Sequence, residues 1–191
     1  MDKDKIILEM IGGRSGKLLD VGGGNGILGT KLPKGIEYIN LDWSKYATIK
    51  CDLNKGKIPF KSRSFDIVIC SEVLEHLFNS RAILKEIKRV VKKGGIVIFT
   101  MPNEYNLYLR LRYLFGENTA HNKPFQGNGE QHVNLPRVKD ILDFIREEFE
   151  PVEVRYLFIS HKKYFFDPLI NALAQVMPTL FCRNVIIRAK G

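Results

Sequence analysis

Residues 18–26 read Leu-Leu-Asp-Val-Gly-Gly-Gly-Asn-Gly, a short apolar run that leads through one carboxylate into a glycine-rich turn. Glycine permits positive φ angles and lets a ligand approach the backbone where a Cβ atom would collide. We expect a strand up to this turn and a helix from about Asn25, which together form the usual cradle of a nucleotide-like ligand. The pattern therefore predicts a ligand site without identifying the ligand.

A second group of reactive side chains follows a later apolar run. Glu72, Glu75 and His76 occupy positions i, i+3 and i+4, so one helical turn would place them on one face. Such a cluster could serve as a base for proton removal. The alternative is that Glu75 and His76 stabilise the fold beside the ligand. We favour the structural role and keep both residues as candidate catalytic groups.

Apolar runs of strand length alternate with helical periods along the chain, which predicts an α/β fold with a mostly parallel sheet covered by helices on both faces. No clear helix separates the last two runs, so the final strand is expected to be antiparallel. The clearest predicted helix spans 80–93 and is ended by Gly94 and Gly95, and a second spans 136–149. The predicted strands are 17–21, 36–41, 65–70, 96–101, 152–159 and 184–189.

Two stretches interrupt this alternation. Residues 102–132 are long for a connection, with an apolar first part, 106–115, and a loop-like second part, 116–129. Residues 161–181 are rich in aromatic and aliphatic side chains. Either stretch could cover a substrate, add to the core or pair two subunits as a homodimer. We treat residues 1–191 as a single domain that contains both inserts.

The chain has 191 residues and a formal net charge of +9. The basic residues are scattered, which favours a solvated basic surface over a nucleic-acid site. Cys51, Cys70 and Cys182 show no metal-binding spacing, and we expect them to be reduced thiols. We find neither a secretory signal nor an apolar run of membrane-spanning length, and we expect a cytoplasmic protein.

The glycine turn can be parsed in two ways. Gly24 to Gly29 matches the dinucleotide fingerprint GxGxxG, which is weak alone. The alternative parse is Asp20-x-Gly22-x-Gly24-x-Gly26. With Asn-Leu-Asp-Trp at 40–43, Cys-Asp-Leu-Asn at 51–54 and the runs 65–77 and 84–100, the chain resembles the class I S-adenosylmethionine-dependent methyltransferases, in particular the methyltransferase type 11 or UbiE/UbiG-like branch. The resemblance implies a Rossmann-like seven-stranded sheet.

The resemblance also implies a role for each matching residue. Asp42, at a strand end, would accept hydrogen bonds from both ribose hydroxyls of S-adenosylmethionine. Trp43 and Leu53 would flank the adenine, and Asp52 would accept from its amine. Asp20 and the turn would border the methionine moiety. The other implied cofactor residues are Gly22, Gly23, Gly24, Asn25, Gly26, Ser71 and Glu72.

Methyl transfer from a sulfonium to an acceptor needs alignment and removal of one proton, and it leaves S-adenosylhomocysteine. Related small-molecule methyltransferases often carry a histidine just before the helix predicted at 136–149, which makes His132 a candidate substrate-side base. The Glu72, Glu75 and His76 motif also resembles that of some quinone-type O-methyltransferases with a divalent metal, although we expect no metal here.

We therefore expect a methyltransferase that acts on an oxygen, or less readily a nitrogen, of a small or lipid-like molecule. Residues 101–103 and 110–116 resemble the MetW-like group, in which the fold can serve as an accessory partner of another enzyme. An accessory cofactor-binding protein is thus the first alternative. An RNA methyltransferase is the second, and it rests on charge alone.

Overall fold

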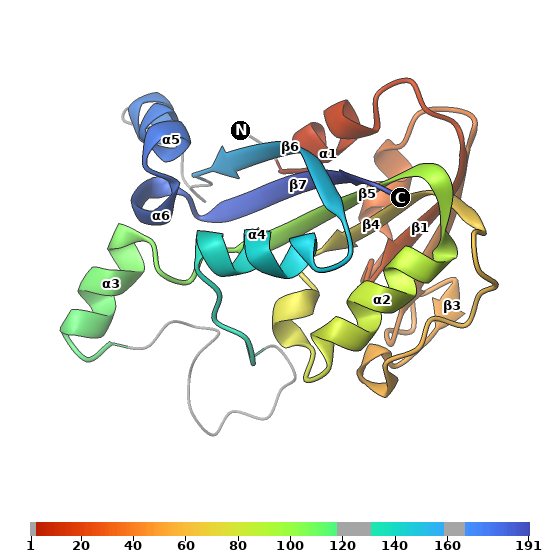
Figure 1. Cartoon of the computed structure of the whole chain (residues 1–191), viewed down its shortest axis with the longest axis horizontal. Coiled ribbons are helices and arrows are strands. Elements are labelled where there is room, and N and C mark those ends of the chain that lie inside the picture. Colours follow the sequence, from red (N-terminus) through yellow and green to blue (C-terminus); the bar gives the residue numbers. More distant parts are fainter. Residues whose placement is uncertain (1–2, 118–130, 159–166) are drawn as a thin grey trace.

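The computed structural model describes residues 3–117, 131–158 and 167–191. Its centre is one twisted sheet of seven strands in the order β3-β2-β1-β4-β5-β7-β6 (Figure 1). The strands are β1 (Gly16–Val21), β2 (Ile36–Asp42), β3 (Ile49–Lys50), β4 (Phe65–Ser71), β5 (Val91–Pro102), β6 (Glu150–Leu157) and β7 (Asn184–Lys190).

The strand directions confirm the predicted sheet. The neighbouring pairs from β3 through β5 are parallel, whereas β7 is antiparallel to both β5 and β6. The strand order reverses beside β1, which pairs with β2 on one side and β4 on the other. In open α/β sheets a ligand binds at such a reversal, beyond the carboxyl ends of the strands.

Helices cover both faces of the sheet, so the side chains of β1 enter two separate cores. Leu19 belongs to one core and its neighbour Leu18 to the other. One core contains α2 and α4, and the other contains α1. The sequence pattern did not indicate α1, whose Ile6, Ile7 and Met10 are at most 1% exposed. The helices are α1 (Lys3–Ile11), α2 (Ser80–Val90), α3 (Leu107–Leu114), α4 (Val138–Arg146), α5 (Asp167–Val176) and α6 (Pro178–Phe181), and the short 3₁₀ segments are η1 (Ile27–Lys31), η2 (Leu53–Lys55) and η3 (Leu74–His76).

Two predicted helices differ from those observed. The helix expected from Asn25 is only the 3₁₀ segment η1, preceded by Gly26 at a φ of 74°. The helix expected over 80–93 ends at Val90, because the backbone is already extended at Val91. Lys92 therefore belongs to β5, where its ammonium donates to Asp66 Oδ1 at 2.8 Å, rather than to a helix end.

The two inserts are partly described. The apolar part of the first forms α3, which Asn106 caps by accepting from the Leu109 amide at 3.2 Å. The loop predicted to follow lies outside the described residues from 118 to 130, as does the start of the second insert up to 166. The rest of that insert forms α5 and α6. Within the described ranges, no helix is long and apolar enough to cross a membrane.

Candidate active site

A cleft of about 880 Å³ opens beyond the carboxyl ends of β1, β2 and β4, at the reversal of strand order. Its walls come from the glycine turn after β1, the ends of β2 and β3, the segment that contains η2, and the segment from β4 into η3. The lining residues are Gly22, Asp42, Trp43, Lys50, Cys51, Asp52, Leu53, Asn54, Lys55, Glu72, Val73, His76 and Leu77.

The glycine turn is shaped by three residues with positive φ angles, Gly22 at 72°, Gly24 at 55° and Gly26 at 74°. A Cβ atom on Gly22 would lie 2.3 Å from Val73 Cγ2, so no larger residue fits between the turn and η3. A Cβ atom on Gly24 would meet nothing within 4 Å. Glycine is thus required at 22 by packing and at all three positions by backbone conformation.

Asp20 supports this turn from inside the fold. Its carboxylate is 3% exposed and accepts from the Tyr38 hydroxyl at 2.7 Å. Burial raises the pKa of Asp20 from its ordinary 3.8 to about 6, against the opposing effect of the Tyr38 hydrogen bond. The sequence placed Asp20 beside the ligand, whereas the cleft wall does not include it. Its observed contacts are those of a residue that braces the turn.

Asp42 joins the turn to the cleft. Its Oδ2 accepts from the Gly24 amide at 3.0 Å, and its Oδ1 accepts from the Ser44 amide at 2.7 Å. A carboxylate oxygen can accept more than one hydrogen bond, so both atoms retain capacity for the two hydroxyls of a ribose. Trp43 follows directly and is 71% exposed at the cleft edge, where it offers a flat apolar wall.

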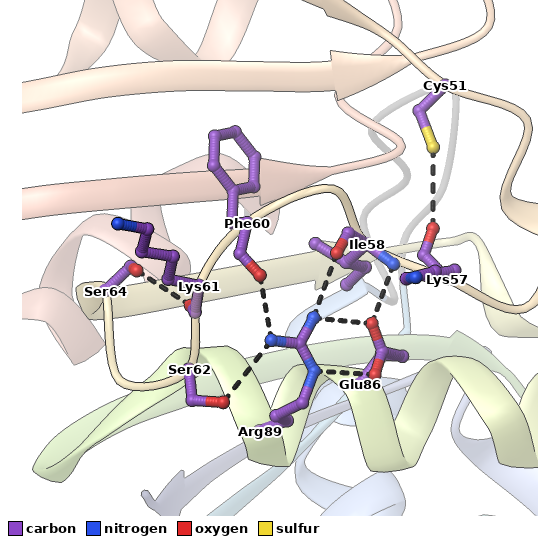
Figure 2. Close-up of polar contacts among 9 residues, drawn as sticks. All are labelled: Cys51, Lys57, Ile58, Phe60, Lys61, Ser62, Ser64, Glu86 and Arg89. Atoms are coloured by element: carbon purple, nitrogen blue, oxygen red, sulfur yellow. Dashed lines mark hydrogen bonds and ion pairs between the residues drawn. The ribbon is translucent and has the colours of Figure 1, made fainter.

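The opposite wall carries Asp52 and Leu53. Asp52 caps η2 by accepting from the Asn54 amide at 3.0 Å, and Leu53 is 8% exposed. The loop that follows is fixed to α2 by Arg89 (Figure 2), whose guanidinium donates to the Ile58 and Phe60 carbonyl oxygens at 2.9 and 2.8 Å.

Glu86 completes this anchor. It accepts from the Ile58 amide at 2.8 Å and pairs with Arg89, whose hydrogen bond lowers the pKa of the Glu86 carboxyl. The same close-up shows the Cys51 thiol directed at the Lys57 carbonyl, 3.6 Å away. Sequence reasoning did not single out Glu86 or Arg89, because their role depends on contacts between distant segments.

The structure divides the predicted cofactor residues into two sets. Those that line the cleft are Gly22, Asp42, Trp43, Asp52, Leu53 and Glu72. Those outside its wall are Asp20, Gly23, Gly24, Asn25, Gly26 and Ser71.

The segment after β4 brings several polar groups together. Glu72 has a φ of 55°, an uncommon conformation for a residue with a side chain. Its carboxylate accepts from the Thr100 hydroxyl at 2.7 Å and from the Asn184 amide nitrogen at 3.1 and 3.2 Å. Ser71 and Thr100 share a hydrogen bond of 2.9 Å. These contacts from β5 and β7 hold Glu72 in its strained position at the cleft.

Glu75 is fully buried, and neither of its carboxylate oxygens has a hydrogen-bond partner among the described residues. Burial, followed by repulsion from Glu72, raises the pKa of the Glu75 carboxyl well above its usual value. Buried carboxylates are rarely left unpaired. The site therefore disfavours the charged form of Glu75 unless a cationic partner lies beside it.

Two histidines adjoin Glu75. His76 lines the cleft, and its Nδ1 lies 3.0 Å from the Gln131 carbonyl oxygen. His132 Nδ1 lies 2.5 Å from Glu104 Oε1. The two rings meet edge to face with centroids 4.7 Å apart. Each Nδ1 faces an oxygen that accepts, so each carries the proton, and the lone pair of the neutral ring is on Nε2.

The structure thus brings all three predicted catalytic residues, Glu75, His76 and His132, into one cluster. The sequence did not indicate Glu104, which is 28 residues before His132. The ligand atoms of the three residues lie within 4.8 Å of one another, and a carboxylate with two imidazoles is a donor set that suits a divalent ion. The composition of the cluster fits both a proton acceptor and a cation site.

Comparison with known proteins identifies this arrangement. The family model for the methyltransferase domain matches residues 3–146, which include the cleft and the cluster. The chain belongs to this family. It is a class I domain of the S-adenosylmethionine-dependent methyltransferases, with the seven-stranded sheet expected of that class.

Relatives and solved structures agree with this assignment. The methyltransferase is 31% identical to the ubiquinone biosynthesis O-methyltransferase of Aliivibrio fischeri over 114 residues, which cover 51% of this chain and 49% of that protein. It spans about half the length of the curated relatives that it matches. A methyltransferase from Archaeoglobus fulgidus superimposes with a TM-score of 0.62 at 20% identity, covering 98% of this chain and 90% of that one.

A third similar protein shows the cofactor of the family. Phosphoethanolamine N-methyltransferase 2 of Haemonchus contortus, solved with S-adenosyl-L-methionine, superimposes with a TM-score of 0.63 at 16% identity, covering 98% of this chain and 52% of that one. For this chain, S-adenosylmethionine follows as the cofactor from its membership of the methyltransferase family. A dinucleotide, which the GxGxxG reading of the glycine turn would allow, is the cofactor of a different class of proteins.

Proposed function

We propose that this methyltransferase transfers the methyl group of S-adenosylmethionine to a hydroxyl oxygen of a small or lipid-like acceptor, with His132 as the proton acceptor. The observation that carries the proposal is the contact between His132 and Glu104, because a buried carboxylate stabilises the imidazolium that forms when His132 takes a proton.

The cofactor would lie along the cleft. Its ribose hydroxyls would bond to Asp42, its adenine would lie between Trp43 and Leu53, and Asp52 would accept from the adenine amine. The cationic sulfonium would then lie near the carboxylate of Glu72, at the end of β4. The turn residues that lie outside the cleft wall would act by holding the backbone that faces the methionine moiety.

The reaction is a displacement in one step. The acceptor oxygen attacks the methyl carbon, the bond between that carbon and sulfur breaks, and the sulfur keeps the electron pair as S-adenosylhomocysteine. The acceptor hydroxyl proton passes to His132 Nε2. The Nδ1 atom of His76 faces a neutral carbonyl oxygen, whereas that of His132 faces a carboxylate. We assign His76 and Glu75 to the walls around the acceptor.

The same cluster could instead hold a divalent cation through Glu75, His76 and His132, and the cation would lower the pKa of the acceptor hydroxyl. An assay of S-adenosylhomocysteine release over phenols, catechols and long-chain hydroxylated acceptors tests the proposal, with and without EDTA. We expect turnover that EDTA changes by less than twofold. Loss of turnover with EDTA and its recovery with Mg²⁺ would show that a bound cation, rather than His132, activates the acceptor hydroxyl.

The two other candidate functions predict different results. An accessory protein would bind S-adenosylhomocysteine, turn over no acceptor in the panel and form a stable complex with a partner enzyme. An RNA methyltransferase would bind RNA with an affinity that falls steeply with salt. Turnover of a small hydroxylated acceptor excludes the first, and absence of RNA binding at low salt excludes the second.

A further inference from the structure

Glu72 lies where the cofactor cleft meets the cluster of Glu75, His76 and His132, which we name the acceptor cluster. It follows the last residue of β4 directly and lines the cleft beside Val73 and His76. Repulsion from Glu72 is one cause of the raised pKa of Glu75, so the two carboxyl groups are close enough to interact. Glu72 therefore belongs to both the cleft and the border of the acceptor cluster.

The Glu72 carboxylate is held by groups that leave its charge uncompensated. Thr100 on β5 donates its hydroxyl at 2.7 Å, and Asn184 on β7 donates its amide nitrogen to both oxygens at 3.2 and 3.1 Å. Both donor groups are neutral, and no lysine or arginine of the described ranges forms an ion pair with Glu72. A partly buried charge without an opposite charge is costly, so we expect a cationic ligand beside it.

The backbone of Glu72 is held in the same place as its side chain. Its φ of 55° is uncommon for a residue with a Cβ atom, and its amide donates to the Thr100 carbonyl oxygen at 3.0 Å. Such a conformation persists only where the surrounding structure enforces it, and it is typical of functional sites. Thr100 thus fixes both the backbone and the carboxylate of this one residue.

The direction of the carboxylate distinguishes the two cationic groups of the cofactor. S-adenosylmethionine carries an ammonium at its methionine end and a sulfonium near its centre. The glycine turn, beside which we place the methionine end, follows β1, whereas the donors to Glu72 are on β5 and β7, on the other side of β4. The carboxylate is therefore directed away from the turn and toward the acceptor cluster, where the methyl group must point for transfer.

We propose that Glu72, positioned by Thr100 and Asn184, makes the cleft select the sulfonium of S-adenosylmethionine over the neutral thioether of S-adenosylhomocysteine. The attraction between the carboxylate and the sulfonium is lost when the methyl group leaves, so the product is held less tightly and exchanges for fresh cofactor. The inference rests on the proposed position of the cofactor in the cleft. It is independent of the acceptor and of His132 as the proton acceptor.

Calorimetry without an acceptor tests this selection. The affinities for S-adenosylmethionine and S-adenosylhomocysteine are compared in each variant. Sinefungin, in which a carbon with an ammonium group replaces the methylated sulfur, is a second cationic ligand. We expect the wild type to bind both cationic ligands about tenfold more tightly than S-adenosylhomocysteine. In Glu72→Gln, whose amide carries no charge, the affinities should agree to within about twofold.

Asp52→Asn is the matched control, because it removes a carboxylate from the adenine side of the same cleft. It should weaken the binding of all three ligands by one factor and leave the ratio of their affinities as in the wild type. Thr100→Val and Asn184→Leu each remove a donor that orients Glu72, so each should lower the ratio by about threefold. Thr100→Ser keeps the hydroxyl and should keep the ratio of the wild type.

A ratio in Glu72→Gln equal to that of the wild type would overturn the proposal. Equal weakening of all three ligands would have this result, because Glu72 would then face the ammonium that they share. If Glu72→Gln does not fold, equal ratios in Thr100→Val and Thr100→Ser would contradict the assignment. Turnover of a hydroxylated acceptor tests the proposed reaction separately, so either result can stand without the other.

Discussion

The Nδ1 atom of His132 lies 2.5 Å from Glu104 Oε1, and both side chains are no more than 7% exposed. The contact joins the segment after β5 to the segment before α4 and fixes the tautomer of the imidazole. If His132 accepts the acceptor proton, His132→Gln should lower kcat by about 10²–10⁴-fold. The Kd for S-adenosylhomocysteine should stay within twofold, because neither residue lines the cofactor cleft.

Glu104→Gln separates a positioning role from a purely structural one. The amide can still accept from Nδ1 but cannot stabilise the imidazolium as a carboxylate does, so the kcat should fall while the Kd for S-adenosylhomocysteine stays unchanged. Thermal unfolding of each variant serves as the control. An unchanged kcat in Glu104→Gln would contradict the role that we assign to the pair.

Asp42 should control cofactor affinity. Asp42→Ala removes the expected ribose acceptor and the support of the Gly24 amide, each a hydrogen bond to a charged group. We expect the Kd for S-adenosylhomocysteine in calorimetry to rise by about 10–100-fold. Glu37→Ala is a matched control from the same strand, because Glu37 is 57% exposed and away from the cleft. Equal affinities in both variants would refute the assignment.

Asp20 should make the stability of the fold depend on pH. Its pKa is about 6 in the folded protein, against an ordinary 3.8, so the folded state binds the proton more tightly. The contribution of Asp20 to the free energy of unfolding is fully present below pH 3.8 and is lost as the pH rises through 6. The change amounts to about 3 kcal/mol. Relative to the wild type, Asp20→Asn should therefore gain stability in urea unfolding between pH 4.5 and 7.5.

The control for this pH dependence is Asp66, whose pKa is lowered by the hydrogen bond from Lys92. Asp66→Asn should show the opposite trend and lose stability relative to the wild type as the pH rises. If both variants respond in the same direction, the environment assigned to Asp20 is wrong.

Gly22 should be intolerant of a side chain. In Gly22→Ala the new Cβ atom meets Val73 Cγ2 at 2.3 Å at a φ of 72°, and we expect a loss of about 2–4 kcal/mol in urea unfolding. In a Val73→Ala background the steric clash is absent. The free energy of unfolding that Gly22→Ala costs should therefore be smaller there than in the wild type. Gly13→Ala, where a Cβ atom meets nothing within 4 Å, should be nearly neutral.

Local patterns predicted six of the seven strands, whereas the two-residue strand β3 and the cleft residues after it came from the family resemblance. The strands β1, β2 and β4 are apolar runs that end at the cleft, and Asp42 is the last residue of β2. Parallel strands bring their carboxyl ends to one edge, so residues far apart in sequence meet there. This geometry explains why Gly22, Asp42, Asp52 and Glu72 all reach one cleft.

Other features depend on tertiary contacts that no local pattern contains. The helix over 80–93 was predicted too long, because Lys92 is drawn into β5 by Asp66 on the neighbouring strand. Helix α1 was missed, although Ile6, Ile7 and Met10 pack on the sheet. The hydrogen bond between Asp20 and Tyr38 on β2 was not foreseen either. Glu104 has no motif of its own, and only the fold brings it to His132.

The most direct test of the central claim is a crystal structure with S-adenosylhomocysteine. We expect both ribose hydroxyls on Asp42, the adenine between Trp43 and Leu53, and the sulfur on the side of the cleft that leads to His76 and His132. Density for the nucleoside outside this cleft, or a nicotinamide dinucleotide bound there in preference, would contradict this claim.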